Sequence, residues 1–448
     1  MPVALVALAT FIAVIIIWNV IFKRNMGEAM GLGLVATSLF AGSEAPHYLV
    51  RGLAGALNHD VLYAALAFVF MAYLVEVTAL IDKIIAVLNS ALGRVRGGPA
   101  YVATAGSAVF GALSGSNSAN TAAGGSFTGP WMVRTGWSPA RAATILAGNG
   151  GLGAAIPPSA SMVIMIGFAG DLVTTAQVYL ALLSAGLYQI IHRIILVRYF
   201  VFKDNIPPTG SDVEIAPLRT SLREGAGAIS IFLGALIPIL VTVGPIADYL
   251  ATSPLANALG SISMLIWIPV LITLFALMAG RKQLPNDWTS WRQLLDGSMS
   301  RFTTVGALLF FAIAASEILG DLGLAEDVRR MIEVVPLNAV GMVVIVGLLV
   351  TIVAGPLSST ATLTAVGQVS LFALIGVGID PLLAVVAILV FASTEGASPP
   401  ASGSIFVAAG LTGAKPEQTF VPLIVYYMVP IFFLACLIGW ELLPIWRS

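Results

Sequence analysis

The residues best suited to chemistry in this sequence of 448 residues are clusters of neutral oxygen-bearing side chains inside long apolar segments. The first cluster contains Ser116, Asn117, Ser118 and Asn120. The second contains Ser358, Ser359, Thr360 and Thr362. A sodium ion in a membrane protein is bound by oxygens of this kind, and an anionic substrate group is bound by a helix N-terminus. We therefore expect cation and substrate sites here, against the alternative that small residues serve only helix packing.

Each cluster has a partner segment in which glycine and proline interrupt an apolar helix. The first break, residues 147–159, contains four glycines and Pro157-Pro158, and the second, residues 391–400, ends in Pro399-Pro400. Such residues remove helical hydrogen bonds and expose carbonyl oxygens, although a simple kink would explain one break. Polar side chains in or beside the breaks are Asn149, Ser159, Ser161, Ser393, Thr394, Glu395, Ser398 and Ser402. Glu395 is ionisable at membrane depth, so we expect it to bind a cation, relay a proton or receive a helix dipole.

Enzymatic chemistry has little support in the sequence. His47, His59 and His192 fall at expected loop or helix-end positions away from the two hairpin segments, 98–133 and 336–376, that hold these clusters, and no H-E-x-x-H or P-loop motif occurs. The single cysteine, Cys436, excludes a disulfide framework. No arginine occurs in either cluster or break, so we expect dipoles, backbone and hydroxyls to recognise the substrate. The sequence predicts a protein that is not an enzyme.

The elements that position these residues are predicted from composition. The chain is 58% hydrophobic and 10% charged, whereas soluble domains carry about 25% charged residues. It therefore needs a lipid bilayer, and its net charge of −1 argues against nucleic-acid binding. Ten spanning helices are predicted at about 2–22, 26–42, 60–81, 138–169, 172–201, 226–248, 255–280, 300–320, 378–411 and 418–446. Residues 98–133 and 336–376 are predicted to form re-entrant helical hairpins.

Basic residues indicate the orientation of these elements. Loops rich in Lys and Arg are cytoplasmic, and they include Lys23 with Arg24, Arg94 with Arg96, and the connection that begins at Arg193. The first apolar stretch lacks a basic segment before it and a cleavage site, so we interpret it as a retained helix. Both chain ends are then expected outside the cytoplasm.

An internal repeat organises the chain. Pro157-Pro158 and Pro399-Pro400 lie 242 residues apart, and the same offset relates Ser116 to Ser358. Five crossings separate equivalent helices, so the second copy is expected to be inverted, as in many secondary transporters. Chance spacing of two unrelated breaks is the weaker alternative. The predicted divisions are N-terminal scaffold helices 1–59, a first repeat 60–202, a polar loop 203–225, scaffold helices 226–299 and a second, inverted repeat 300–448.

The order of these motifs resembles the large membrane subunit of TRAP transporters (DctM-like), within the ion transporter superfamily. The similarity rests on residues 93–99, 111–120 and 156–159, the connection 284–316, and residues 399–410, and it covers nearly the whole chain. This resemblance implies an elevator mechanism with sodium coupling in the bacterial inner membrane, and no organic cofactor. It also implies a periplasmic substrate-binding protein, a small four-helix membrane subunit and a small organic anion as substrate. Because the chain starts at the large subunit's first helix, we expect the small subunit to be a separate polypeptide.

Carried over by position, the resemblance implies two sodium sites. The expected ligands are Ser116, Asn117, Asn120, Gly153 and Pro157 for the first, and Ser358, Ser359, Thr362, Thr394 and Ser398 for the second. The expected substrate contacts are Ser118, Asn149, Ser159, Ser161, Thr360, Glu395 and Ser402. Family members commonly have Ser-Thr where this chain has Gly150-Gly151, and an acid in the second hairpin tip, where this chain has none.

Alternatives to a tripartite importer are distinguishable by experiment. A stand-alone cation-coupled carboxylate permease of the same superfamily would take up substrate without partners. A membrane scaffold or sensor would tolerate loss of Asn117 and Asn120, and an intramembrane hydrolase would depend on one particular serine.

Overall fold

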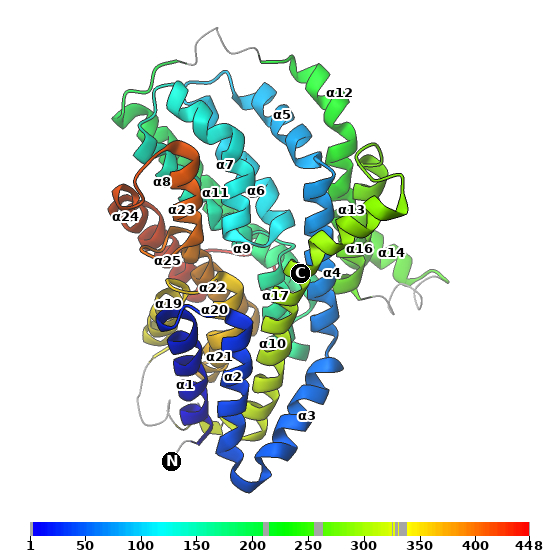
Figure 1. Cartoon of the computed structure of the whole chain (residues 1–448), viewed down its shortest axis with the longest axis vertical. Coiled ribbons are helices and arrows are strands. Elements are labelled where there is room, and N and C mark those ends of the chain that lie inside the picture. Colours follow the sequence, from blue (N-terminus) through cyan, green and yellow to red (C-terminus); the bar gives the residue numbers. More distant parts are fainter. Residues whose placement is uncertain are drawn as a thin grey trace.

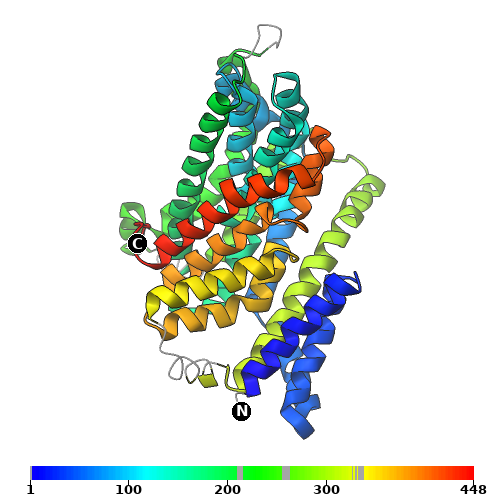
Figure 2. The same cartoon turned by 90° about the vertical axis from the view of Figure 1, so that its left-hand side faces the viewer.

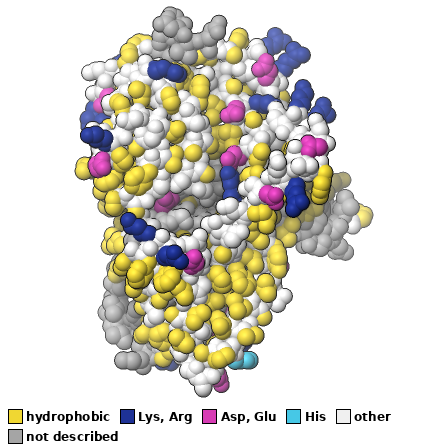
Figure 3. All heavy atoms as spheres, viewed as in Figure 1, with side chains coloured by type: hydrophobic (Ala, Val, Ile, Leu, Met, Phe, Trp, Pro, Cys, Tyr) yellow, Lys and Arg dark blue, Asp and Glu magenta, His cyan; other side chains and the backbone are white. Residues whose placement is uncertain are grey.

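The computed structural model describes residues 3–208, 215–254, 263–324, 326–327, 330 and 338–447. Over these residues all regular structure is helical, which confirms the predicted all-α fold. Seven helical segments within the described chain are long and apolar enough to cross a membrane, and five shorter apolar helices accompany them. Figure 3 shows a surface dominated by hydrophobic side chains in its lower part, with most charged groups in the middle and upper parts.

One group of helices, here called the peripheral helices, is built around a long central member. This member is α17 (Trp288–Asp321), and the described helices α2 (Met26–Ser38), α3 (Ala45–Leu57) and α4 (Asp60–Val77) pack against it. Helix α1 (Val3–Ile16) packs on α2. Figure 2 shows α1, α2, α3 and α17 slanted together at one side of the molecule.

A second part of the peripheral group flanks α4 at its other end. Helices α12 (Leu218–Ile229) and α13 (Leu233–Thr242) are joined by a short turn and continue into α14 (Pro245–Ala251). Helix α16 (Met264–Ala279) packs on α13 and α4, and α12 packs on α5 (Leu80–Leu92). Gly234 allows the contact between α13 and α16, since a Cβ there would lie 2.4 Å from the backbone nitrogen of Ile272.

The two predicted hairpins are present in the described residues. The first is α6 (Gly98–Ser114) followed by α7 (Asn117–Arg134). The second is α19 (Ala339–Ala354) followed by α20 (Ser359–Thr362), a π-helical turn (Leu363–Gly367) and α21 (Gln368–Gly376). Ser116 caps α7 and Ser358 caps α20, so the repeat offset extends to the capping side chains. In Figure 1 the first hairpin lies in the upper half of the molecule and the second in the lower half.

Both broken helices are also present, each with a cis bond between its two prolines. The first runs through α8 (Pro139–Gly150), α9 (Leu152–Ala155) and α10 (Ala160–Ala169). The second runs through α22 (Pro381–Ala392), the 3-10 turn η6 (Ser393–Ala397) and α23 (Gly403–Thr412). Their N-caps, Ser138 and Asp380, are again related by the repeat offset.

The hairpins and broken helices cross over one another. Helix α7 packs on α8 from its own repeat and on α23 from the other, whereas α21 packs on α22 and α10. Each hairpin thus contacts the first half of its own broken helix and the second half of the other. Helix α11 (Thr175–Lys203) and the final helical segment complete this hairpin assembly. That segment runs through α24 (Glu417–Leu423), a π-helical turn (Ile424–Met428) and α25 (Val429–Gly439).

Several predicted boundaries differ from the structure. Helix α12 begins at Leu218, inside the predicted polar loop 203–225, and α17 runs without interruption across the predicted boundary between residues 299 and 300. Helices α3 and α5 were not among the predicted spans. Residues 209–214, 255–262 and 336–337, which the predictions also cover, lie outside the described residues.

Candidate ion and substrate site

The tip of the first hairpin meets both breaks at the centre of the hairpin assembly. Gly153 lies against this tip, because a Cβ at that position would be 2.9 Å from the carbonyl oxygen of Ser116. The two breaks also touch each other, since a Cβ on Gly396 would lie 2.6 Å from the backbone nitrogen of Gly151. These close approaches require glycine, so the glycine-rich breaks bring three polar segments into one place.

Asn117 joins the first hairpin to the second break. Its amide nitrogen donates a hydrogen bond to Oε2 of Glu395, and the hydroxyl of Ser402 donates to Oε1 of the same carboxyl at 3.2 Å. Glu395 is only 5% exposed and Asn117 only 2%. Such donors favour the ionised form of a buried carboxyl, which would supply negative charge to a bound cation.

Three amide oxygens around this centre have no hydrogen-bond donor. Oδ1 of Asn117, Asn120 and Asn149 are all buried, and none has a partner within the described residues. The amide nitrogens are used, since Asn120 donates to the carbonyl of Gly150 at 3.2 Å and Asn149 donates to the hydroxyl of Thr104 at 3.1 Å. Buried acceptors without donors are rare in folded proteins. Such oxygens, near the Glu395 carboxyl, are of the type that a sodium ion would require.

Four of the predicted first-site ligands, Ser116, Asn117, Asn120 and Gly153, therefore lie close together, although what they bind stays a prediction. Ser116 accepts from the backbone nitrogen of Ala119 at 3.4 Å and caps α7. Asn117 and Asn120 lie one turn apart near the start of α7, and Gly153 adjoins Oδ1 of Asn117. Pro157 lies at the cis bond that follows α9.

The second hairpin tip approaches a different element. It packs on α10, the second half of the first broken helix. The hydroxyl of Ser358 lies 3.2 Å from that of Thr360, while Ser359 and Thr362 are buried. Buried hydroxyls on both elements, Thr362 on the hairpin and Ser161 on α10, lack hydrogen-bond partners in the described chain. Polar atoms available for binding thus occur at this tip too.

Other predicted second-site residues use their side chains locally. The hydroxyl of Thr394 donates to the carbonyl of Phe391 at 2.6 Å, and that of Ser398 donates to the carbonyl of Thr394 at 2.8 Å. These bonds satisfy carbonyls freed by the second break. Each hydroxyl oxygen keeps lone pairs after it donates, so Thr394 and Ser398 still offer acceptor atoms, while their hydrogens are used locally.

The predicted substrate contacts fall into two groups. Ser118 lies against the start of α23, where a Cβ on Gly403 would be 2.6 Å from its hydroxyl, and Asn149, Glu395 and Ser402 lie around the same hairpin tip. Ser161 and Thr360 belong to the packed pair α10 and α20. Ser159 caps α10 by accepting from the backbone nitrogen of Met162 at 3.2 Å.

Arg193 is a residue that the sequence reasoning misplaced. It was expected in a cytoplasmic connection, but it lies inside α11 and is fully buried. Its Nη2 donates to the carbonyl of Gly148 at 3.0 Å, and Nη1 donates to the side-chain oxygen of Gln189 at 3.1 Å. No carboxylate of the described chain lies within ion-pair distance of it. A polar pair four residues apart in an apolar helix, Gln189 and Arg193, was the signal that could have identified it.

The guanidinium replaces local caps that the first break lacks. At the end of α22, Ser393 and Thr394 donate to carbonyls of their own helix. The end of α8 has Gly150 and Gly151 instead, and Arg193 reaches in from α11 to the carbonyl of Gly148. A Cβ on Gly151 would lie 3.3 Å from Nη2 of Arg193. The glycine pair and the buried arginine are therefore complementary.

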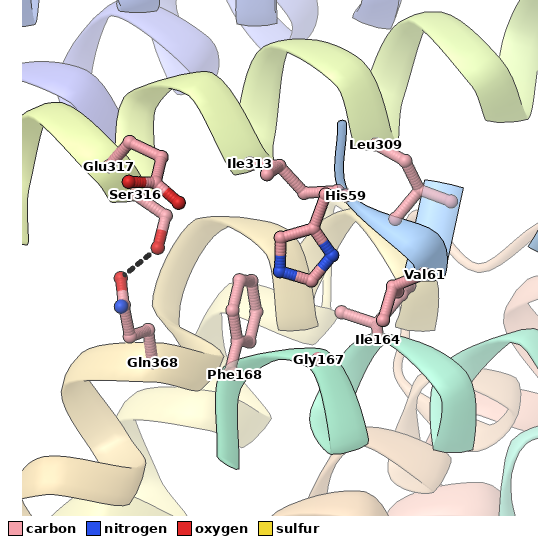
Figure 4. A pocket seen from close by; sticks show the side chains of 10 residues that line it. All are labelled: His59, Val61, Ile164, Gly167, Phe168, Leu309, Ile313, Ser316, Glu317 and Gln368. Carbon is pink, nitrogen blue, oxygen red and sulfur yellow. Dashed lines mark hydrogen bonds between the residues drawn. The ribbon is translucent and has the colours of Figure 1, made fainter. Parts of the chain in front are cut away.

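A pocket of about 120 Å³ lies where the hairpin assembly meets the peripheral helices. Figure 4 shows His59 and Glu317 on its peripheral side and Phe168 and Gln368 on the opposite side. The hydroxyl of Ser316 on α17 donates to the side-chain oxygen of Gln368 at 2.6 Å. The expectation that all histidines lie far from the hairpins is therefore wrong for His59, and His192 lies inside α11 rather than at its end.

Comparisons with known proteins find a family model that matches most of this chain. The model of the family described as "Tripartite ATP-independent periplasmic transporter, DctM component" matches residues 3–443. The C4-dicarboxylate TRAP transporter large permease protein DctM of Pseudomonas aeruginosa is 23% identical over 91% of this chain and 90% of its own length. The isethionate TRAP transporter permease protein DctMQ of Oleidesulfovibrio alaskensis is 24% identical over 87% of this chain, which spans 59% of that longer relative.

A further relative is named for a different compound. The ectoine/5-hydroxyectoine TRAP transporter large permease protein UehC of Ruegeria pomeroyi is 23% identical over 90% of this chain and 89% of its own length. Among solved structures, the YdaH transporter of Alcanivorax borkumensis matches with a TM-score of 0.64 at 14% identity, covering 89% of each chain. MtrF of Neisseria gonorrhoeae matches with a TM-score of 0.62 at 14% identity, covering 89% of this chain and 85% of its own. These two likenesses concern the fold.

Proposed function

Because the chain belongs to the DctM family of tripartite ATP-independent periplasmic transporters, we propose that it is the large permease subunit that moves a small organic anion across the bacterial inner membrane. The names of its relatives mention a C4-dicarboxylate, isethionate and ectoine, so the substrate differs among related chains. In this chain the substrate is proposed to bind between the first hairpin tip and the second break, near Ser118 and Ser402.

We propose that import is coupled to sodium, and one observation supports this coupling. The buried oxygens Oδ1 of Asn117, Asn120 and Asn149 lack donors in the described chain and surround the glycine-rich first break. A cation without directional bonds satisfies several such acceptors at once, which a water molecule with two donors does not. The Glu395 carboxyl adds the counter-charge. No organic cofactor is proposed.

The motion is an elevator movement of the hairpin assembly against the peripheral helices. Support comes from the crossed packing, because each hairpin binds elements of both repeats and the assembly can move as one body. The Ser316–Gln368 hydrogen bond crosses between the two groups of helices. One such bond is weak enough to break and form again during transport.

The proposed transporter has two further components, a small four-helix membrane subunit and a periplasmic substrate-binding protein. Selection of the substrate would then rest largely with the binding protein, since Arg193 uses its described hydrogen bonds on Gly148 and Gln189.

The deciding experiment compares proteoliposomes that contain the chain alone, the chain with its small subunit, and both with the binding protein. Uptake of radiolabelled organic anions is measured with an inward sodium gradient and with choline in its place. The proposal expects uptake only from the complete set in sodium. Uptake by the chain alone would instead support a stand-alone permease.

The same vesicles separate sodium coupling from proton coupling. If Glu395 assists sodium binding, Glu395→Gln raises the sodium concentration needed for half-maximal uptake, and an imposed pH gradient without sodium gives no uptake. Uptake driven by the pH gradient alone, and lost in Glu395→Gln, would contradict sodium coupling.

A further inference from the structure

A second, larger cavity lies on the outside of the hairpin assembly, away from the ion site. Its volume is about 440 Å³. It lies between the connection that follows α5, one face of α6 and one face of α11. The residues that define its chemistry are Arg96, Tyr101, Ala105, Ile190, Ile194 and Arg198.

The cavity combines an apolar wall with two positive groups. Val95 and Ile194 are 45% and 44% exposed, so this side of the molecule presents hydrophobic side chains outward. Arg96 donates to the carbonyl of Ile206, and Arg198 contacts the hydroxyl of Tyr101. Neither guanidinium has a carboxylate within ion-pair distance in the described part of the chain. Guanidinium groups of this kind have donors left for an anion.

The surroundings indicate which side of the membrane the cavity faces. Two further basic residues lie close to the cavity residues in sequence. Arg94, two residues before Arg96, donates to the carbonyl of Ile215, and Lys203 is the last residue of α11, five residues after Arg198. An excess of Lys and Arg marks the cytoplasmic side. The cytoplasmic leaflet carries anionic lipids, and basic pockets between membrane helices bind their headgroups.

We propose that this cavity binds an anionic phospholipid, with its phosphate between Arg96 and Arg198 and an acyl chain along Ile190 and Ile194. A single amphipathic anion satisfies both the apolar wall and the paired guanidiniums, whereas an apolar helix of another protein would leave both charges without partners. The lipid would link α11 and α6 of the hairpin assembly to the connection after α5. The proposal does not depend on the transported substrate.

The test uses the full-length chain purified in detergent and stripped of lipid. Binding of phosphatidylglycerol and of phosphatidylcholine is counted by native mass spectrometry, and thermal unfolding is followed with each lipid. Each arginine near anionic lipid contributes about 1 kcal/mol of binding free energy. For two arginines, we therefore expect phosphatidylglycerol to bind roughly thirtyfold more tightly than phosphatidylcholine. The anionic lipid alone should raise the unfolding midpoint.

Matched variants locate the effect. Arg96→Gln with Arg198→Gln should remove the preference for phosphatidylglycerol, whereas Arg219→Gln with Arg223→Gln, which removes equal charge outside the cavity, should keep it. Ala105→Trp fills the cavity without changing charge and should also abolish binding, so the test stands even if the double arginine variant fails to fold. Equal binding of both lipids by the wild type, or an unchanged preference in Ala105→Trp, would overturn the proposal. Absence of phosphatidylglycerol binding, together with binding of the small subunit that Ala105→Trp abolishes, would overturn it in favour of a protein partner.

Discussion

The side-chain amide of Asn117, at the tip of the first hairpin, donates a hydrogen bond to the carboxyl of Glu395 in the second break, 278 residues along the chain. This bond joins the two repeats at a buried point. It turns Oδ1 of Asn117 toward Gly153 in the first break, where that oxygen has no donor in the described chain. The hydrogen-bond geometry thus presents an acceptor to the proposed ion.

We predict that Asn117→Ala abolishes stabilisation by sodium. When the ligand concentration is a hundredfold above the dissociation constant, binding stabilises the folded state by about 2.7 kcal/mol. The wild type should therefore unfold at a higher temperature in sodium than in choline at equal ionic strength, and the variant should not. Asn58→Ala, at an exposed side chain, is the control and should keep the sodium effect. A full sodium effect in Asn117→Ala would refute the assignment of this residue.

The interaction energy between Asn117 and Glu395 can be measured in the absence of sodium. In choline, a double-mutant cycle with Asn117→Ala and Glu395→Gln should give a coupling energy of about 0.5–3 kcal/mol, as for residues in direct contact. Chemical denaturation in mild detergent supplies the free energies of unfolding. Additive single effects would show that the two side chains do not interact.

We predict that Gly153→Ala disrupts the ion site by a steric route. The new methyl group would lie 2.9 Å from the Ser116 carbonyl and 3.1 Å from Oδ1 of Asn117. Overpacking of this kind costs about 1–3 kcal/mol, and it moves the hairpin tip away from the break. Sodium affinity, read from the sodium dependence of the unfolding midpoint, should fall. Gly410→Ala is the control, because nothing lies within 4 Å of its added methyl group.

We predict that Arg193→Gln destabilises the hairpin assembly. The change removes the donors to the Gly148 carbonyl, and a buried group left unsatisfied costs about 1–3 kcal/mol. Arg193→Lys should recover only part of this loss, because an ammonium cannot make the same planar set of bonds. Denaturant unfolding measures both, with the exposed Arg223→Gln as control. Equal stability of wild type and Arg193→Gln would show that the guanidinium does not hold the break.

A thiol pair tests the proposed elevator movement. The side chains of Ser316 and Gln368 are within hydrogen-bonding distance at 2.6 Å, across the boundary between the peripheral helices and the hairpin assembly. In a background without Cys436, Ser316→Cys with Gln368→Cys should be bridged by Hg²⁺, and uptake should stop until excess thiol removes the metal.

The control places a second thiol pair within the peripheral helices. Arg301 donates to Glu76 at 2.7 Å, and both residues belong to this group. Bridging Glu76→Cys to Arg301→Cys should leave uptake unchanged. Uptake that continues in the bridged Ser316–Gln368 pair would exclude movement at this boundary.

Much of the fold was determined by local sequence. Runs of apolar residues about 20 long can satisfy their backbone only as helices in lipid, so span and hairpin positions followed from composition. The repeat offset also relates two helix caps seen in the structure, because Ser116 and Ser358 begin helices through short-range bonds. The neutral oxygen-bearing clusters and glycine-rich breaks likewise stood out, since polar residues are costly within apolar segments.

Tertiary structure alone decided which of these residues meet. Asn117 pairs with Glu395 because α7 packs on both α8 and α23, and no local pattern encodes contacts between residues so far apart. The position of Arg193 was misjudged for the same reason. The sequence shows an arginine that could begin a basic connection, but it does not show the distant carbonyl that accepts its hydrogen bond inside the fold. The break at Gly150-Gly151 provides that carbonyl, and only folding brings α11 against it.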